Sequence, residues 1–508
     1  MEQTHILKFV PPATSAGRPR LARLGDWMAR HRRAILTVQW IIVVFYTVLV
    51  ALPAFLPNPL PESRLFSGDY GASSFIDPNL CLASGEPMLQ DKAPTLTPWH
   101  DKLVLLAQFA FWGVWWPFVI LSTMLMGRVW CGVLCPEGAL TEFVSRHGRG
   151  GRIPRWVRWS GWPLVAFALT TIYGQLISVY EYPKAVLLIL GGSTVAAMVA
   201  GYLWGKGKRV WCRYLCPVSG VFALLARLAP FAFRVDRDAW ERHPAKRAAV
   251  DCAPLLDVKH LQSMSQCHAC GRCSDHREAV TLAPRSPNAE ILGGPPPAAT
   301  EALLLIFGML GVAVGAFQWT VNPWFVRGKQ GAAEWLVNHD ILWPLADSPA
   351  WWLLTSYPEA NDVFTWLDGI AIVAYIGGVA LVLGGTILLA VRGAARLAGI
   401  DWRRLALGLI PLAGISLFLG LSMMTVTHLR AEGIAPGWLP ALRAVLLTIG
   451  VAWSAWLGWQ LLKAPASNPT PGRIGVGVGT PAVRALAGLV WLLPLVAIGA
   501  VWSLVFFT

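Results

Sequence analysis

The sequence RVWCGVLCP at Arg128–Pro136 recurs almost unchanged as RVWCRYLCP at Arg209–Pro217. Each copy directly follows an apolar run long enough to cross a membrane. Both copies enter the membrane with the same orientation, so we expect a parallel repeat related by an axis along the membrane normal. Two such units would bring together the four cysteines Cys131, Cys135, Cys212 and Cys216.

A third cysteine motif, CHACGRC, contributes Cys267, Cys270 and Cys273 with the C-x2-C-x2-C spacing of an iron–sulfur ligand run. Ferredoxin runs continue with a fourth cysteine before a proline, but here Arg277 stands at that position. The motif therefore lacks one thiolate. We expect Cys252, just upstream, to replace it.

The sequence leaves other ligand sets open. His268 or His276 could serve instead of Cys252, because histidine ligates some iron–sulfur centres. Cys135 or Cys216 could complete the CHACGRC site, since the cysteine before proline ligates the other cluster in two-cluster ferredoxins. Either partition of the eight cysteines gives two four-cysteine clusters.

Two interpretations without iron compete with this one. Cys252, Cys267, Cys270 and Cys273 could hold zinc, and the repeated pairs could be free or palmitoylated cysteines. The ninth cysteine, Cys81, falls in a segment expected outside the cytoplasm, where it has no partner, so no disulfide is predicted.

Composition predicts the fold class. The chain is 55% hydrophobic and 14% charged, whereas soluble domains carry about 25% charged residues. We predict an all-α polytopic membrane protein of about nine transmembrane helices with a small cytoplasmic ferredoxin-like iron–sulfur insert. The apolar runs lie at about 34–56, 103–126, 159–179, 185–204, 302–321, 366–391, 405–427, 440–462 and 485–506.

Charge distribution predicts the topology. The net charge of +14 comes from basic residues between the apolar runs, as the positive-inside rule requires, and no groove-reading motif suggests nucleic acid. We therefore place the N-terminus and all eight candidate ligands on the cytoplasmic side. The expected parts are a basic N-terminus (1–33), two hairpin repeats (34–217), an iron–sulfur segment (218–300) and a C-terminal five-helix membrane domain (301–508).

A second set of residues falls at the expected outer face. Imidazole and thioether side chains there could bind copper, iron or haem, although interfacial histidines are more often simply solvated. These residues are His100, His339, His428, Met423 and Met424. The Trp-rich helices could also bind quinone, for which the sequence offers no motif.

The combination of two membrane-adjacent C-x3-C-P motifs with a following ferredoxin-like cysteine run resembles the NapH/NosR/CcoG-type membrane polyferredoxins over residues of about 35–285. This resemblance implies 4Fe-4S electron transfer between the membrane and periplasmic redox systems. The layout is most similar to the ferredoxin subunit of FtrABCD-type iron uptake systems. The chain departs from the family at Arg277, in lacking a flavin domain before the helices, and in carrying five apolar runs instead of a terminal immunoglobulin-like domain.

We therefore predict an electron-transfer subunit of a bacterial-type inner membrane rather than a self-contained enzyme. It would pass electrons between a cytoplasmic or quinone donor and a periplasmic metal ion or metalloprotein, with a redox protein or permease as partner. The alternative is a membrane transporter, or a regulator that senses redox state or zinc. Few ionisable residues interrupt the helices, which argues against transport. Because the hydrocarbon layer is about 30 Å thick, ligands on one face form only half of an electron route.

Overall fold

The structure is a computed structural model that describes residues 19–59, 63, 65, 97–243, 250–463 and 481–507. Among these residues, eight helical segments are long and apolar enough to cross a bilayer. The expected ninth is α7 (Trp162–Leu176), an apolar helix of only 15 residues. The protein is therefore a multi-pass, mostly helical membrane protein, as predicted. Cys81 lies outside the described residues.

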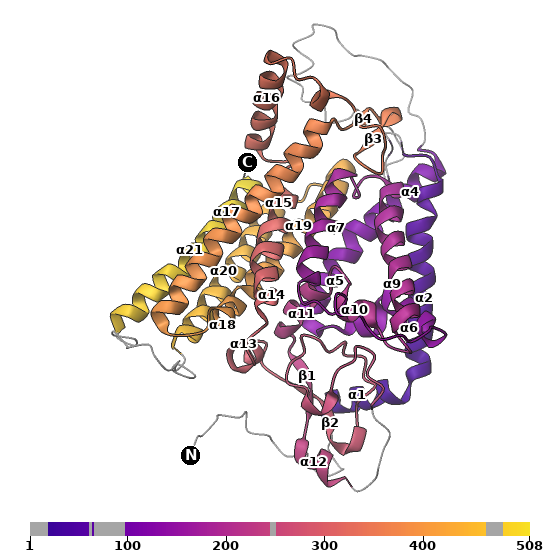
Figure 1. The fold of residues 1–508 in the computed structure, drawn as a ribbon, viewed down its shortest axis with the longest axis vertical. Helices are drawn as coiled ribbons and strands as arrows, with labels where there is room; N and C mark the ends of the chain where they lie inside the picture. The colour runs from indigo at the N-terminus through magenta and orange to yellow at the C-terminus, as the bar shows by residue number, and fades with distance from the viewer. Residues whose placement is uncertain are drawn as a thin grey trace.

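The N-terminal half builds the repeat (Figure 1). Its helices are α1 (Arg20–Arg30), α2 (Arg32–Ala51), α4 (Trp99–Gln108), α5 (Trp116–Met126), α6 (Pro136–Arg146), α7, α8 (Pro183–Val186), α9 (Gly192–Trp204) and α10 (Val210–Tyr214). One wide π-helical turn, Phe109–Trp115, joins α4 to α5, and another, Leu187–Gly191, joins α8 to α9. Helices α6 and α9 pack directly against each other, so the two copies of the repeat share one interface.

The π-helical turn before α5 has a chemical cause. Pro117 has no N–H and its ring clashes with the carbonyl four residues earlier. The carbonyl oxygen left free is that of Gly113, and Thr425 Oγ1 of α19 donates to it at 2.5 Å. A hydroxyl from a neighbouring helix thus satisfies a backbone group that no water could reach inside a bilayer.

The C-terminal half forms a second bundle. Its elements are α14 (Ala299–Leu303), a π-helical segment (Leu304–Val312), α15 (Ala313–Gln318), α17 (Trp366–Ala398), α18 (Trp402–Ala406), α19 (Ile410–Ala431), α20 (Leu439–Lys463) and α21 (Pro481–Phe507). A capping box of Thr365 and Asp368 starts α17, and Gly399 in the left-handed conformation ends it. Of the eight spans, the one containing α19 is the most enclosed by the rest of the chain.

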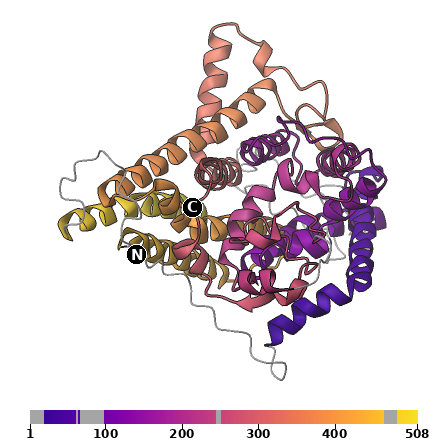
Figure 2. The same cartoon turned by 60° about the horizontal axis from the view of Figure 1, so that its bottom comes forward.

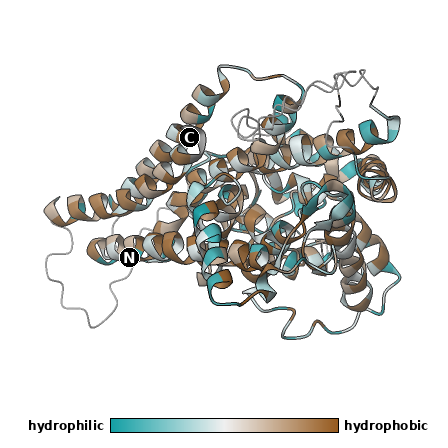
Figure 3. Ribbon diagram, turned by 90° about the horizontal axis from the view of Figure 1, so that it is seen from above, coloured by the Kyte–Doolittle hydropathy of each residue, from teal (hydrophilic) through white to brown (hydrophobic). Residues whose placement is uncertain are grey.

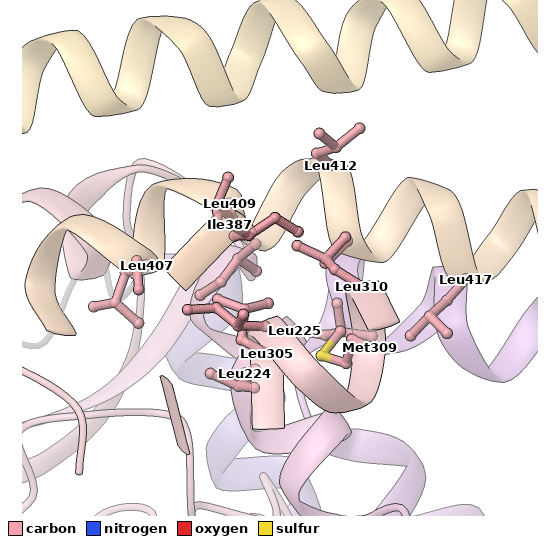
Figure 4. Close-up of a cluster of buried hydrophobic side chains, with 14 of the residues drawn as sticks. Leu224, Leu225, Leu305, Met309, Leu310, Ile387, Leu407, Leu409, Leu412 and Leu417 are labelled. Atoms are coloured by element: carbon pink, nitrogen blue, oxygen red, sulfur yellow. The ribbon is translucent and has the colours of Figure 1, made fainter. Parts of the chain in front are cut away.

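The largest apolar core lies where the two halves meet. Helix α11 (Ser219–Leu225) contributes Leu224 and Leu225, which pack with leucines of the Leu304–Val312 segment and of α19 (Figure 4). Helix α11 stands at the start of the predicted segment 218–300, and its apolar side chains are buried in this core.

The insert lies at the end of the bundle where all the described cysteines are found, called here the cysteine end (Figures 1 and 2). Strands β1 (Phe231–Val235) and β2 (Val280–Pro284) pair antiparallel, with Phe233 opposite Leu282. Short helices α12 (Arg237–Arg242) and α13 (Ala289–Gly293) flank the ladder. Helix α1 packs against β2, and Ser274 Oγ donates to Asp26 Oδ1 at 3.0 Å.

The opposite end carries α16 (Pro323–Asn338) and a short ladder of β3 (Ser356–Tyr357) with β4 (Asp362–Val363). Seen from this end, hydrophobic residues dominate most of the long helices (Figure 3). These apolar helices separate this end from the cysteine end (Figure 1).

Removing a buried leucine tests this core. Leu305 is fully buried, so Leu305→Ala should destabilise the fold by about 2 kcal/mol. This value is near the lower limit for a buried leucine, because lipid rather than water surrounds the helices and only packing is lost. Thermal unfolding in detergent measures the effect. Leu381, 70% exposed on α17, is the matched control, and equal losses for both variants would contradict this packing.

Candidate metal centre

The eight described cysteines form two groups, and none is in a disulfide. The first group lines one end of a cavity of about 230 Å³ that extends into the bundle. It consists of Cys131, Cys135, Cys212 and Cys216. The second group lines a small cavity in the insert and consists of Cys252, Cys267, Cys270 and Cys273. The sequence left open which cysteines share a site. In the fold, the four cysteines of the repeated motifs lie together, and Cys252 lies with the three cysteines of CHACGRC.

The thiols of the first group are buried close to one another. Burial raises the pKa of Cys212 to about 12, and the neighbouring Cys131 raises it further. Burial raises the pKa of Cys135 well above its usual value, and Cys212 and Cys131 add to that shift. Without a compensating cation, these thiols would stay protonated.

Thiols of the second group also have raised pKa values. Burial raises the pKa of Cys267 to about 12, and Cys270 and Cys252 add to it. The pKa of Cys273 is raised well above its usual value, first by burial and then by the other three cysteines. Cys252 therefore lies close enough to the CHACGRC motif to raise the pKa of Cys273, and it lines the same cavity.

Local backbone geometry presents the sulfurs. A π-helical turn, Trp130–Leu134, carries Cys131, and Cys135 is extended and caps α6. The N–H of Gly138 donates to Cys135 Sγ at 3.4 Å, and in the insert the N–H of Ala269 donates to Cys267 Sγ at 3.4 Å. Such donors stabilise thiolates and tune iron–sulfur centres.

The two histidines that could be alternative ligands lie in different surroundings. His276 packs its ring against Trp240 at 5.0 Å, and Arg277 places its guanidinium over the same indole. His268 is fully buried beside the second group, and neither of its ring nitrogens has a hydrogen-bond partner among the described residues. Burial, and then the charges of Arg128 and Arg209, lower the pKa of His268 well below its usual value.

The residues fit iron–sulfur clusters. Each group offers four cysteines that are buried or partly buried, and four thiolates are what a 4Fe-4S cluster requires. Within the described ranges, no three His, Cys, Asp or Glu side chains converge on a position for a single metal ion. Cluster ligation does not require such convergence, because the four thiolates bind different irons.

The two groups touch through the backbone. Gly132, next to Cys131, lies so close to the CHACGRC loop that a Cβ there would overlap the His268 carbonyl oxygen and lie 3.0 Å from Cys270 N. Only glycine allows this approach. The two cysteine groups are consequently adjacent.

An ionic network locks the three motifs together. Arg209, from the second repeat, donates through Nε to Glu142 Oε2 at 2.9 Å. Arg272, from CHACGRC, donates to Glu142 Oε1 at 2.6 Å. Although burial alone would raise the pKa of Glu142, the two arginines lower it to about 2. Glu142 belongs to α6, the helix that starts at the first motif.

Sequence reasoning missed Glu142, Arg272 and Gly132. All six residues that follow the proline differ between the two copies, so the change from Glu142 to Ala223 gave no specific signal. Gly132 carries no signal either.

The expected outer-face residues lie apart from the cysteines. His100 Nε2 is 3.2 Å from Asp101 Oδ1. His339 stacks on Trp335 at 4.2 Å, and His428 Nδ1 lies 2.8 Å from Met424 O. Met423 and Met424 pack with hydrophobic neighbours in two different clusters. A metal or haem site made of these residues stays a prediction.

The class of the protein follows from these observations together with a family comparison. Residues 108–154 and 187–236 match the 4Fe-4S binding domain family. Each range contains one copy of the repeated motif with its two cysteines. The chain is therefore a multi-pass membrane protein with a 4Fe-4S binding domain, which confirms the resemblance at this level.

Individual relatives are distant. The regulatory protein NosR of Pseudomonas aeruginosa is 27% identical over 182 residues, 32% of this chain and 25% of that protein. The putative electron transport protein YccM of Escherichia coli is 25% identical over 181 residues, 31% and 50% of the two chains. The methylamine utilization ferredoxin-type protein MauN of Paracoccus denitrificans is 23% identical over 236 residues, 42% and 74%.

These similarities make the chain a distant homologue of NosR, YccM and MauN. The chain spans between a quarter and half of the length of the first two. No solved structure matches the chain.

Replacing Glu142 tests the ionic network. Glu142→Gln leaves Arg209 buried without its counter-charge, which should cost about 3–5 kcal/mol. We expect a lower unfolding temperature together with reduced iron content. Asp251→Asn is the matched control, because Asp251 pairs with Lys208 and Arg272 from a side chain that is 54% exposed, where ion pairs contribute little. A Glu142→Gln protein as stable as the control would contradict the assigned role.

Enlarging Gly132 tests the contact between the groups. Gly132→Ala should push the CHACGRC loop away from the first group, because the new methyl group overlaps backbone atoms that cannot rotate aside. Electron paramagnetic resonance of the reduced protein should then show weaker magnetic interaction between two clusters, or loss of one. Gly192→Ala, in α9 with open space around its Cα, should change neither; unchanged spectra in both variants would refute the contact.

Proposed function

We propose that the protein is a membrane electron-transfer protein with two 4Fe-4S clusters, one in each cysteine group. The main support is that two separate sets of four cysteines, each buried or partly buried, lie next to each other. Such a cluster accepts or donates one electron at a time. The chain holds the sulfurs, supplies N–H donors to two of them and places the two groups in contact.

The cysteine end would face the cytoplasm. The loop after α6 carries the exposed arginines Arg149, Arg152, Arg155 and Arg158, and excess positive charge favours retention on the cytoplasmic side. The proposed parts remain the basic N-terminus 1–33, the repeats 34–217, the iron–sulfur segment 218–300 and the membrane domain 301–508. Five described spans in the last part support its assignment as a membrane domain.

The proposed donor is a cytoplasmic protein or a quinone in the membrane. The proposed acceptor is a periplasmic metal ion or metalloprotein, including the iron of an uptake system, reached through a permease or redox partner. The five-helix C-terminal domain supports this layout, and the names of the relatives include an electron transport protein and a ferredoxin-type protein. The cavity beside the first group extends among Trp112, Trp116 and Tyr180 into the bundle, so the membrane interior has access to that group.

Iron analysis tests the proposal. Anaerobically purified protein should contain iron and acid-labile sulfide for two 4Fe-4S clusters and should bleach with dithionite. Cys252→Ala should lose half of the iron because the second group loses its fourth thiolate. Cys81→Ala is the matched control and should keep all of it.

Three outcomes would count against the proposal in different ways. A colourless protein with stoichiometric zinc would overturn it in favour of a structural or sensing metal site. Full iron content in Cys252→Ala would transfer the fourth ligand position to His268 or to a cysteine of the first group. Loss of all iron in Cys81→Ala would overturn the partition of the cysteines.

A further inference from the structure

The two arginines that open the repeated motifs occupy equivalent sequence positions and are both buried. Arg128 is 4% exposed and Arg209 is 0% exposed. A buried guanidinium is costly unless nearby negative charge compensates it. Glu142 compensates Arg209 only in part, because it also pairs with Arg272.

Each arginine leaves its own motif and reaches another. Arg128 Nη1 donates to Ser265 O, two residues before Cys267, at 3.0 Å. Arg209 Nη1 donates to the carbonyl oxygen of Cys131, and the Arg209 backbone N–H donates to Ala253 O, next to Cys252, at 2.8 Å. Both residues therefore stand between the first and second cysteine groups.

Both guanidinium groups keep unused donors. Nε and Nη2 of Arg128 and Nη2 of Arg209 are buried without a hydrogen-bond partner in the described part of the chain. Arg128 also lines the cavity that the first cysteine group lines.

We propose that Arg128 and Arg209 are shared electrostatic positioning residues that raise the reduction potentials of both clusters together. The inference rests on the proposed function. Four thiolates outweigh the positive charge of a cluster core, so each cluster is anionic and becomes more so on reduction. A cation buried between two such centres stabilises the reduced form of each, and low local dielectric strengthens the effect.

The sharing also has a consequence for electron flow. When one cluster is reduced, its added negative charge disfavours reduction of its neighbour. The two arginines do not remove this repulsion, but each lies near both groups and therefore favours the reduction of either cluster.

A redox titration monitored by electron paramagnetic resonance tests the proposal on the full-length protein in detergent. Arg128→Gln and Arg209→Gln should each shift the midpoint potentials of both clusters to more negative values. Arg128→Lys keeps the charge and should restore most of the potential. Arg149→Gln, an exposed arginine at the same end, is the control and should leave both potentials unchanged.

The outcomes separate the inference from the function it rests on. Wild-type protein without iron–sulfur signals would defeat the proposed function itself. Intact clusters whose potentials stay unchanged in Arg128→Gln, or shift in one cluster only, would overturn the sharing of the arginines. If either glutamine variant fails to assemble clusters, Arg128→Lys is compared with wild type. Potentials well below those of wild type, or loss of clusters although the charge is retained, would refute the electrostatic role.

Discussion

The ion pair between Arg209 and Glu142 is the interaction on which the cysteine end depends. Both side chains are almost completely buried, and a buried charge without its partner is strongly destabilising. The pair joins the second motif to the helix that follows the first, and Arg272 joins the third motif to the same carboxylate. Three segments far apart in the sequence are thereby held around two cysteine groups.

The bilayer imposes the second constraint. Backbone polar groups inside it must be satisfied within the protein. Pro117 breaks one helical hydrogen bond, and Thr425 from α19 donates to the carbonyl oxygen that becomes free. This contact ties the repeat half to the C-terminal half at the level of the membrane. The same region packs α11 and α19 into the shared leucine core, so the two halves form one body.

Much of the fold could be predicted from the sequence. Apolar runs longer than a bilayer needs predicted the helices, because apolar length is what a membrane selects. The lengths of the helices were harder to predict, because α7 has only 15 residues. The short apolar helix α11 fills the core between longer helices. Hydropathy does not distinguish a residue that faces lipid from one that faces a neighbouring helix.

The sequence by itself determined the three motifs with their seven cysteines, and their duplicated spacing predicted a metal centre that also includes Cys252. It left the partition open, since all the motifs lie at one face and each could in principle reach the others. Only the tertiary structure brought Cys252 to the CHACGRC loop and both repeats around one cavity. The physical reason is that Gly132, Glu142, Arg128 and Arg209 act across motifs, through close backbone contact and buried charge, and neither property has a local signature in the chain.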